Sequence, residues 1–354
     1  TEEQKERFRQ LSSELSVLTL KFSQNNLKET NNYELQLSEE QLVGIPESAK
    51  EAYAQTAKEK GKDGYIVTLQ APSFIPFMKY CQSRKLRQEL YMAYNTQCTH
   101  DNEYNNMEIV KQLVNLRLEI AQLLGYETVA DYVLTRRMAE NSRNVYQLLN
   151  QLLEAYTPTA HKELEEIQTL ATELEGNDFQ LMPWDWAYYS RILKEKKFNF
   201  DEEALRPYFE LNKVIEGVFG LATKLYGIRF QENKDIPVYH PDVNAYEVYD
   251  KDNRFLAVLY TDFHPRAGKR SGAWMTNYKE QWIDENGNSR PHVSVTMNFT
   301  KPTADKPALL TFSEVNTFLH DFGHALHGMF ADTTYQSLSG TNVYRDLLAL
   351  PSHF

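Results

Sequence analysis

Two histidines spaced four residues apart are the clearest chemical feature of this chain. His320 and His324 lie in the segment 319–327, whose pattern predicts a helix. Residues i and i+4 share one face of a helix, so both imidazoles can reach a single metal ion at about 2 Å. We therefore predict His320 and His324 as metal ligands. His327, one turn further on, is interpreted as a packed or orienting histidine.

Asp321 follows the first histidine directly. In the zinc motif H-E-x-x-H, a glutamate at this position acts as the general base. We predict the same catalytic role for Asp321, although its carboxylate is set back by one methylene, roughly 1.5 Å.

The alternative interpretation is that the two histidines are four residues apart by chance, on a surface or core helix that binds no metal. The neighbouring residues are largely apolar, and burying an imidazole without a partner is costly, which favours the metal. Gly323, between the histidines, lowers helix propensity by about 1 kcal/mol and calls for a packing or access reason.

A catalytic zinc needs three protein ligands and one open position for water. The third usually comes from a following helix, so we expect it from the segment 338–352. The histidine helix itself should begin at a capping box, with Thr311 as N-cap and Glu314 at N3, and end near Met329.

The rest of the pattern predicts a mainly α fold with a small β-sheet. Strands are expected at 33–37, 65–69, 245–249, 254–262 and 292–299, with a β-hairpin turn at 250–253 and a loop at 265–272. Helices are expected at 2–28, 46–60, through most of 74–125, and at 143–157, 159–175 and 202–226. We expect Pro158 to end the helix before it.

Composition excludes several classes of protein. A chain of 354 residues with 42% hydrophobic residues can form a sizeable core, and its net charge of -11 argues against nucleic acid and anionic membranes as partners. No apolar run approaches the roughly 20 residues that span a bilayer, so we expect a soluble protein. Cys81 and Cys98 are interpreted as core thiols, with a disulfide left open.

Longer motifs resemble the thimet-oligopeptidase family of zinc peptidases, and most of all its peptidyl-dipeptidase branch. The motifs that carry the resemblance are 260–266, 269–275, 293–299, 311–315, 320–330 and 338–343. The resemblance implies a zincin-like (gluzincin) helical fold with a deep channel, one Zn²⁺ ion and short unstructured peptides as substrates. It also implies a monomer, with an N-terminal helical segment at 1–84 and a partial catalytic domain at 85–354.

The resemblance also shows two departures. The family's third zinc ligand is a glutamate that aligns with Ala349, which cannot bind zinc, and Asp321 replaces the base glutamate. Asp346, three residues before Ala349, is a candidate substitute ligand, or an acid that orients a histidine. We therefore expect a metallopeptidase with impaired activity and weakened zinc binding.

Two alternatives stay open at this point. One is a catalytically inactive relative that binds peptides or has a structural role, and the other is a helical scaffold without a peptide ligand. The chain starts at Thr1 without a secretory signal and stops before the family's substrate-binding tyrosines, so we expect an incomplete chain. Its compartment is left open between cytoplasm and periplasm.

Overall fold

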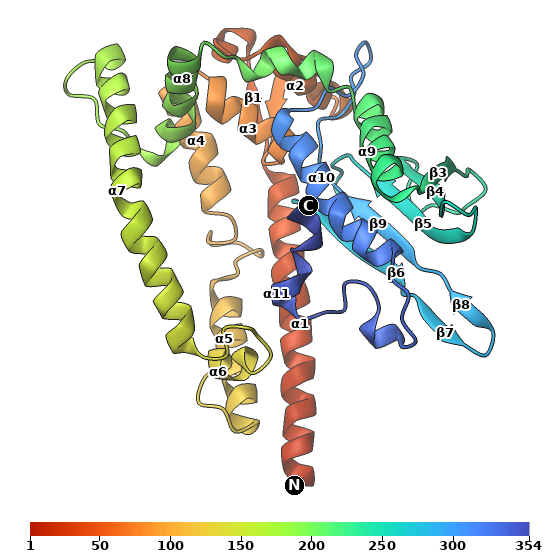
Figure 1. Ribbon diagram of the computed structural model, residues 1–354. Coiled ribbons are helices and arrows are strands. Elements are labelled where there is room, and N and C mark those ends of the chain that lie inside the picture. The colour runs from red at the N-terminus through yellow and green to blue at the C-terminus, as the bar shows by residue number, and fades with distance from the viewer. Residues whose placement is uncertain (354) are drawn as a thin grey trace. The chain divides into compact units, whose positions relative to one another are not determined.

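The computed structural model describes residues 1–353 and divides the chain into two compact units, Thr1–Phe200 and Asp201–Phe354 (Figure 1). The predicted mainly α fold with a small β component is confirmed. The division that the sequence suggested after residue 84 stays a prediction. No helix among residues 1–353 has the length and apolar character needed to cross a membrane.

The first unit is helical apart from one two-stranded antiparallel sheet. Its strands are β1 (Leu35–Leu37) and β2 (Tyr65–Val67). Its helices are α1 (Glu2–Asn32), α2 (Glu47–Glu59), α3 (Ala71–Tyr80), α4 (Arg84–Asn95), α5 (Met107–Leu123), α6 (Val129–Leu134), α7 (Ser142–Glu175) and α8 (Trp186–Phe198), with 3-10 turns η1 (Glu39–Leu42) and η2 (Pro183–Asp185).

The long helix α1 is held by its contacts with α5. Leu11 is fully buried, and the buried Asn25 donates its side-chain amide to Asn106 Oδ1 at 2.9 Å. A second core forms where α2, α3 and α4 enclose the small sheet. Both cysteines of this unit, Cys81 and Cys98, are buried free thiols, so the disulfide alternative is wrong.

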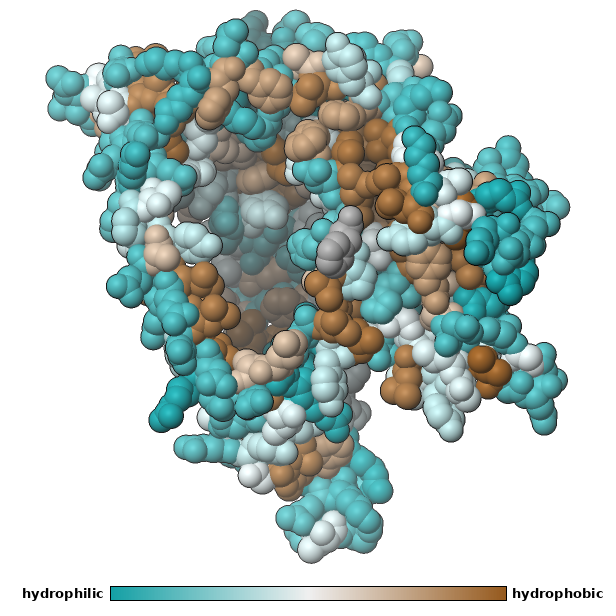
Figure 2. Space-filling view, in the orientation of Figure 1, coloured by the Kyte–Doolittle hydropathy of each residue, from teal (hydrophilic) through white to brown (hydrophobic). Residues whose placement is uncertain are grey.

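The predicted break at Pro158 is wrong, because α7 runs through it without interruption. Proline removes one helical hydrogen bond and leaves the carbonyl of Glu154 without its usual donor. The residues around this position are exposed, so water can satisfy that carbonyl. The same part of α7 carries exposed apolar side chains, such as Leu149 and Leu153. Figure 2 shows hydrophobic surface, in brown, along part of this helix.

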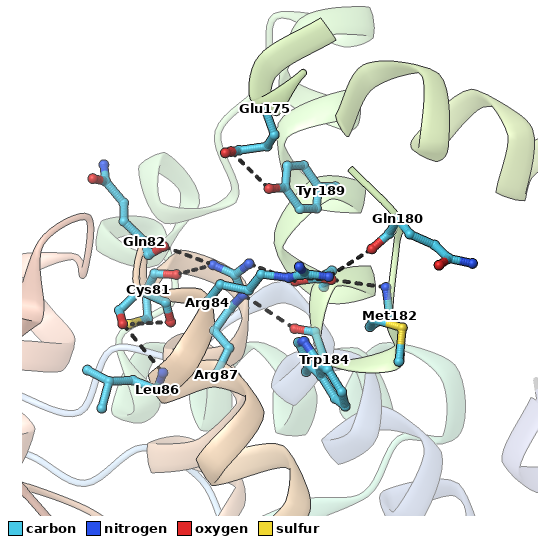
Figure 3. Close-up of polar contacts among 12 residues, drawn as sticks. Cys81, Gln82, Arg84, Leu86, Arg87, Glu175, Gln180, Met182, Trp184 and Tyr189 are labelled. Carbon is cyan, nitrogen blue, oxygen red and sulfur yellow. Dashed lines mark hydrogen bonds and ion pairs between the residues drawn. The ribbon is translucent and has the colours of Figure 1, made fainter. Parts of the chain in front are cut away.

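An ion cluster around the buried side chains of Asp185 and Arg87 joins α4 to the turn before α8 (Figure 3). The Asp185 carboxylate accepts from Arg84 Nη2 at 2.7 Å and from Arg87 Nη2 at 2.9 Å. It also accepts from the backbone N–H of Met182 at 3.0 Å. Arg87 donates in addition to the carbonyls of Cys81 and Trp184, so each charge in the cluster is paired and the cluster has a structural role.

The second unit is built on a five-stranded sheet of order β3-β4-β5-β9-β6. Its strands are β3 (Arg229–Glu232), β4 (Val243–Tyr249), β5 (Phe255–Asp262), β6 (Trp274–Lys279) and β9 (His292–Thr296), and a separate hairpin is formed by β7 (Trp282–Asp284) and β8 (Gly287–Ser289). Its other elements are η3 (Glu202–Tyr208), α9 (Leu211–Tyr226), α10 (Phe312–Met329), η4 (Gln336–Leu338), α11 (Arg345–Leu348) and η5 (Pro351–His353).

The predicted hairpin is confirmed, and the strand predicted at 292–299 is found as β9, which ends earlier, at Thr296. Strands β5 and β9 pair in parallel, and the other pairs of this sheet are antiparallel. The hairpin turn at 250–253 is largely exposed. Figure 2 shows mostly hydrophilic surface, in teal, at this end of the sheet. Alternate residues of β5 enter different cores, with Leu259 beneath α9 and α10 and Tyr260 on the other face.

The helix predicted over 202–226 is interrupted, since η3 and α9 are separated by an extended link at Phe209 and Glu210. Here the backbone bonds to another segment: Leu211 N–H donates to the Ala308 carbonyl, and Leu310 N–H donates to the Phe209 carbonyl. The spacing of apolar residues cannot indicate this pairing, because the two segments are about 100 residues apart. The pairing places the segment 308–310, which precedes α10, beside the start of α9.

Candidate metal centre

The helix that carries the two histidines starts where the sequence predicts. Thr311 Oγ1 accepts from the N–H of Glu314 at 3.1 Å, and the Glu314 carboxylate accepts from the N–H of Thr311 at 2.8 Å. That carboxylate also accepts from the N–H of Thr300 at 2.8 Å, which ties the helix start to the chain after β9. The predicted capping box and the helix end at Met329 are both confirmed.

The structure brings the imidazoles of His320 and His324 together on one face of α10. Their ring centroids lie 4.9 Å apart with an interplanar angle of 88°. Nδ1 of His324 is buried and has no hydrogen-bond partner among the described residues. A buried nitrogen of this kind costs free energy unless a ligand completes it, which fits a metal bound by this pair.

Burial favours the neutral form of two histidines of α10, His324 and His327. Burial, reinforced by the charge of His320, lowers the pKa of His324, although hydrogen bonding to the Leu348 backbone opposes this. Burial also lowers the pKa of His327. The neutral imidazole, which is the form that binds metal, is therefore favoured.

Asp321 lies buried on α10, between the positions of the two histidines. Burial raises the pKa of its carboxyl to about 6, and the charge of His320 opposes the rise. At neutral pH the carboxylate form prevails, and a pKa near the working pH suits a general base.

The expected third ligand is missing from its expected place. Ala349 ends the four-residue helix α11 and offers only a methyl group. Asp346 lies on the exposed part of that helix. Among residues 1–353, no group of three or more His, Cys, Asp or Glu side chains is positioned to hold a metal ion. The pair His320 and His324 therefore fits zinc as two ligands and lacks a formed third.

Sequence reasoning missed His353, which the fold brings to the same place. Its ring centroid lies 5.2 Å from that of His320, at an interplanar angle of 64°. The sequence could have indicated this histidine, because His353 directly follows the segment 338–352 from which a third ligand was expected.

Gly323 makes the approach of this segment possible. A Cβ atom at Gly323 would lie 2.6 Å from the Cα of Ser352 and 3.1 Å from the carbonyl oxygen of Pro351. Real Cβ atoms essentially never come within 3.0 Å of a backbone atom. The predicted packing reason for a glycine in mid-helix is thus found in the docking of η5 against α10.

A second ion cluster anchors the loop 265–272. The Asp262 carboxylate accepts two hydrogen bonds from Arg266, at 2.8 and 2.7 Å, and one from Lys269 Nζ at 2.9 Å. Lys269 is itself buried and also donates to the backbone carbonyl of His264. Burial of the carboxyl acts to raise the pKa of Asp262, but the hydrogen bonds from Arg266 and Lys269 outweigh it and hold that pKa below its usual value.

Comparison with known proteins assigns the family. Residues 77–354 match the model of peptidase family M3. The chain is 38% identical to oligopeptidase A of Escherichia coli over 359 residues, covering 99% of this chain and 53% of the relative. It is 36% identical to the dipeptidyl carboxypeptidase of E. coli, with 98% of this chain and 51% of the relative covered.

A plant relative is similar over the same extent. The organellar oligopeptidase A of Arabidopsis thaliana is 35% identical over 369 residues, covering 100% of this chain and 46% of the relative. The chain thus spans about half the length of the curated relatives it matches. The resemblance seen in the motifs is confirmed: this chain belongs to peptidase family M3.

Proposed function

We propose that this chain belongs to a zinc-dependent peptidase that hydrolyses short, unstructured peptides. The observation that carries the proposal is the pair His320 and His324, held on one face of a capped helix. The buried Nδ1 of His324 has no hydrogen-bond partner within residues 1–353. Membership of a peptidase family and the relatives named oligopeptidase A and dipeptidyl carboxypeptidase support peptides as the substrate class.

The roles of the residues follow from their positions. His320 and His324 would hold the ion, and rigid placement in the middle of α10 limits their movement. When bound, zinc would act as a Lewis acid on the peptide carbonyl and on water. Asp321 would accept the proton of that water as the general base.

We infer that turnover is slow. The carboxylate of Asp321 is withdrawn by about one C–C bond, roughly 1.5 Å, relative to glutamate. A misplacement of about 1 Å can cost on the order of 100-fold in rate. Ala349 supplies no ligand, which weakens the hold on zinc.

A second candidate function is a peptide-binding relative without catalysis. The observation that favours it is the absence, among residues 1–353, of three ligating side chains placed around one point. Such a protein would bind short peptides whether or not zinc is present.

Zinc uptake separates the two functions. The chain should bind one zinc ion per molecule in competition with a chromogenic chelator, and the His320→Ala variant should not. A matched control is His161→Ala, since this histidine is exposed on α7, far along the chain from α10. Full zinc stoichiometry in His320→Ala, or no uptake by the unaltered chain, would contradict the proposed function.

A further inference from the structure

The end of the histidine helix α10 is held by one arginine, Arg290, which lies between β8 and β9. Its Nη2 donates to the carbonyl of Met329 at 2.9 Å, and its Nη1 donates to the carbonyl of Ala331 at 2.8 Å. Its Nε donates to the carbonyl of Leu256, on β5, at 2.8 Å. This side chain therefore joins the end of α10 to the sheet.

The positive charge of Arg290 acts on the helix end. The last carbonyls of a helix have no donor within the helix, and the C-terminal end of the helix dipole is negative, so a cation is favourable there. The fourth hydrogen bond of the guanidinium goes to the side-chain oxygen of Asn288 at 3.2 Å. Within residues 1–353, no carboxylate forms an ion pair with Arg290, so its strong contacts are those to backbone carbonyls.

The planar guanidinium fixes the orientation of the helix end as well as its distance from the sheet. Because the two bonds to Met329 and Ala331 come from one rigid group, they oppose both sliding of α10 along its axis and rotation about it. The last turn also packs directly on β6, since a Cβ atom at Gly328 would lie 2.6 Å from Cε of Met275.

The rotation of α10 decides where its imidazoles lie. His324 is five residues before Met329, which is about 7.5 Å along the helix axis. Side chains extend about 6 Å from the axis, so a rotation of about 10° moves a ring by about 1 Å. Side chains that form a binding site must be held to within roughly 0.5 Å. A small rotation of α10 is therefore enough to misplace the pair.

We propose that Arg290 is a positioning residue of the proposed metal centre, which fixes the rotation of α10 and thereby the places of His320 and His324. The inference rests on the proposed zinc-binding function, but the placement of the rings can be measured without metal. Loss of Arg290 should affect His327 and His324 more than His320, because Glu314 still ties the start of α10 to the chain after β9.

NMR of the histidine rings in the metal-free 354-residue chain tests this placement. We expect Arg290→Gln to shift or broaden the ring signals of His327 and His324, with a smaller effect on His320. Zinc binding, measured by competition with a chelator, should weaken by about 10-fold, since residues that orient metal ligands typically contribute roughly 10- to 100-fold.

Three further variants make the result decisive. Arg254→Gln removes another arginine of the same unit, whose side chain is 75% exposed, and should change neither readout. Asp262→Asn should destabilise this unit without shifting the ring signals of α10, which separates positioning from stability. Arg290→Lys keeps the charge but loses the planar fork, so it should shift the same signals to a smaller extent. It also provides the test if circular dichroism shows that Arg290→Gln does not fold.

The outcomes distinguish this inference from the function on which it rests. Unchanged ring signals in both Arg290 variants would overturn the inference, whatever their zinc affinity, and the proposed function would stand if the unaltered chain binds zinc. Equal shifts in Asp262→Asn would also overturn it, because the rings would then follow stability. If the unaltered chain binds no zinc, the proposed function fails, and the ring signals alone decide whether Arg290 places the rings.

Discussion

The Cα of Ser352 lies where a side chain at position 323 would have to be, with only 2.6 Å between it and an ideal Cβ on Gly323. This close approach fastens η5 to the helix that carries the histidine pair. It explains why a residue that weakens helices occupies the middle of α10.

Gly323→Ala should lower the free energy of unfolding by about 1–3 kcal/mol, because the clash is with backbone atoms and outweighs the gain in helix propensity of about 1 kcal/mol. Urea unfolding followed by circular dichroism measures the change. Gly217→Ala on α9 is the matched control, since a Cβ there meets no atom within 4 Å. It should stabilise the chain by up to about 1 kcal/mol. Equal effects of the two substitutions would contradict the role of the close approach.

Asp321→Glu should raise the rate at which the zinc-loaded chain cleaves a short fluorogenic peptide. The longer side chain advances the carboxylate by roughly 1.5 Å, and a general base must come within about 3 Å of the proton it takes. The gain could approach the order of 100-fold that a misplacement of about 1 Å costs.

Two controls accompany this prediction. Asp321→Asn keeps the size of the side chain but removes the base, so its rate should fall below that of the unaltered chain. Ala349→Glu combined with Asp321→Glu should cleave faster than either single variant, because it strengthens the hold on zinc as well as restoring the base. Equal rates for the double variant and the unaltered chain would show that the chemistry lies elsewhere.

Asp262→Asn should destabilise the second unit by about 3–5 kcal/mol at neutral pH, because it leaves the buried Lys269 without a carboxylate. The pKa of Asp262 is lowered in the folded state, so its contribution is complete above the ordinary value of 3.8 and is lost as the pH falls below it. Urea unfolding should show a constant difference between the variant and the unaltered chain above about pH 4, narrowing by up to about 1 kcal/mol by pH 3, since one proton changes stability by about 1.4 kcal/mol per pH unit. Asp252→Asn, at an exposed ion pair, should have an effect below about 1 kcal/mol at any of these pH values. A difference between Asp262→Asn and the unaltered chain that does not change with pH would show that the ionised carboxylate is not the source of the stability.

Asp185→Asn should cost about 3–5 kcal/mol of stability in the first unit, because Arg87 is 1% exposed and would lose its carboxylate partner. Denaturant unfolding monitored by tryptophan fluorescence reports the loss, since Trp184 adjoins the cluster (Figure 3). Glu173→Gln breaks the exposed pair with Lys196 and serves as the control, with an expected effect below about 1 kcal/mol. A loss of similar size in both variants would argue against a structural role for the cluster.

Local features of the sequence predicted the elements that depend on near neighbours. The capping box at Thr311 and the hairpin turn at 250–253 involve atoms a few residues apart, so residue types alone indicate them. The i, i+4 spacing likewise predicted that His320 and His324 share a helix face. The family resemblance added the substrate class and the expected positions of the base and third ligand.

Other features were decided by contacts between distant segments. The pattern could not show that Phe209 pairs with Leu310 and interrupts a helix, or that exposure lets α7 continue through Pro158. The strand β6 was missed because its partner β9 follows a loop and a hairpin later in the chain. Such pairings depend on which backbone groups meet in space, and periodicity does not encode that.

The proposed metal centre depends on both kinds of information. The sequence alone determined the histidine pair on α10, because one turn of helix brings its members together. Only the tertiary structure placed His353 beside His320, because the two are 33 positions apart and meet where Gly323 leaves room for the backbone of Ser352. Helix geometry is set by local hydrogen bonds, whereas the approach of η5 depends on the shape of a packed surface that no local pattern specifies.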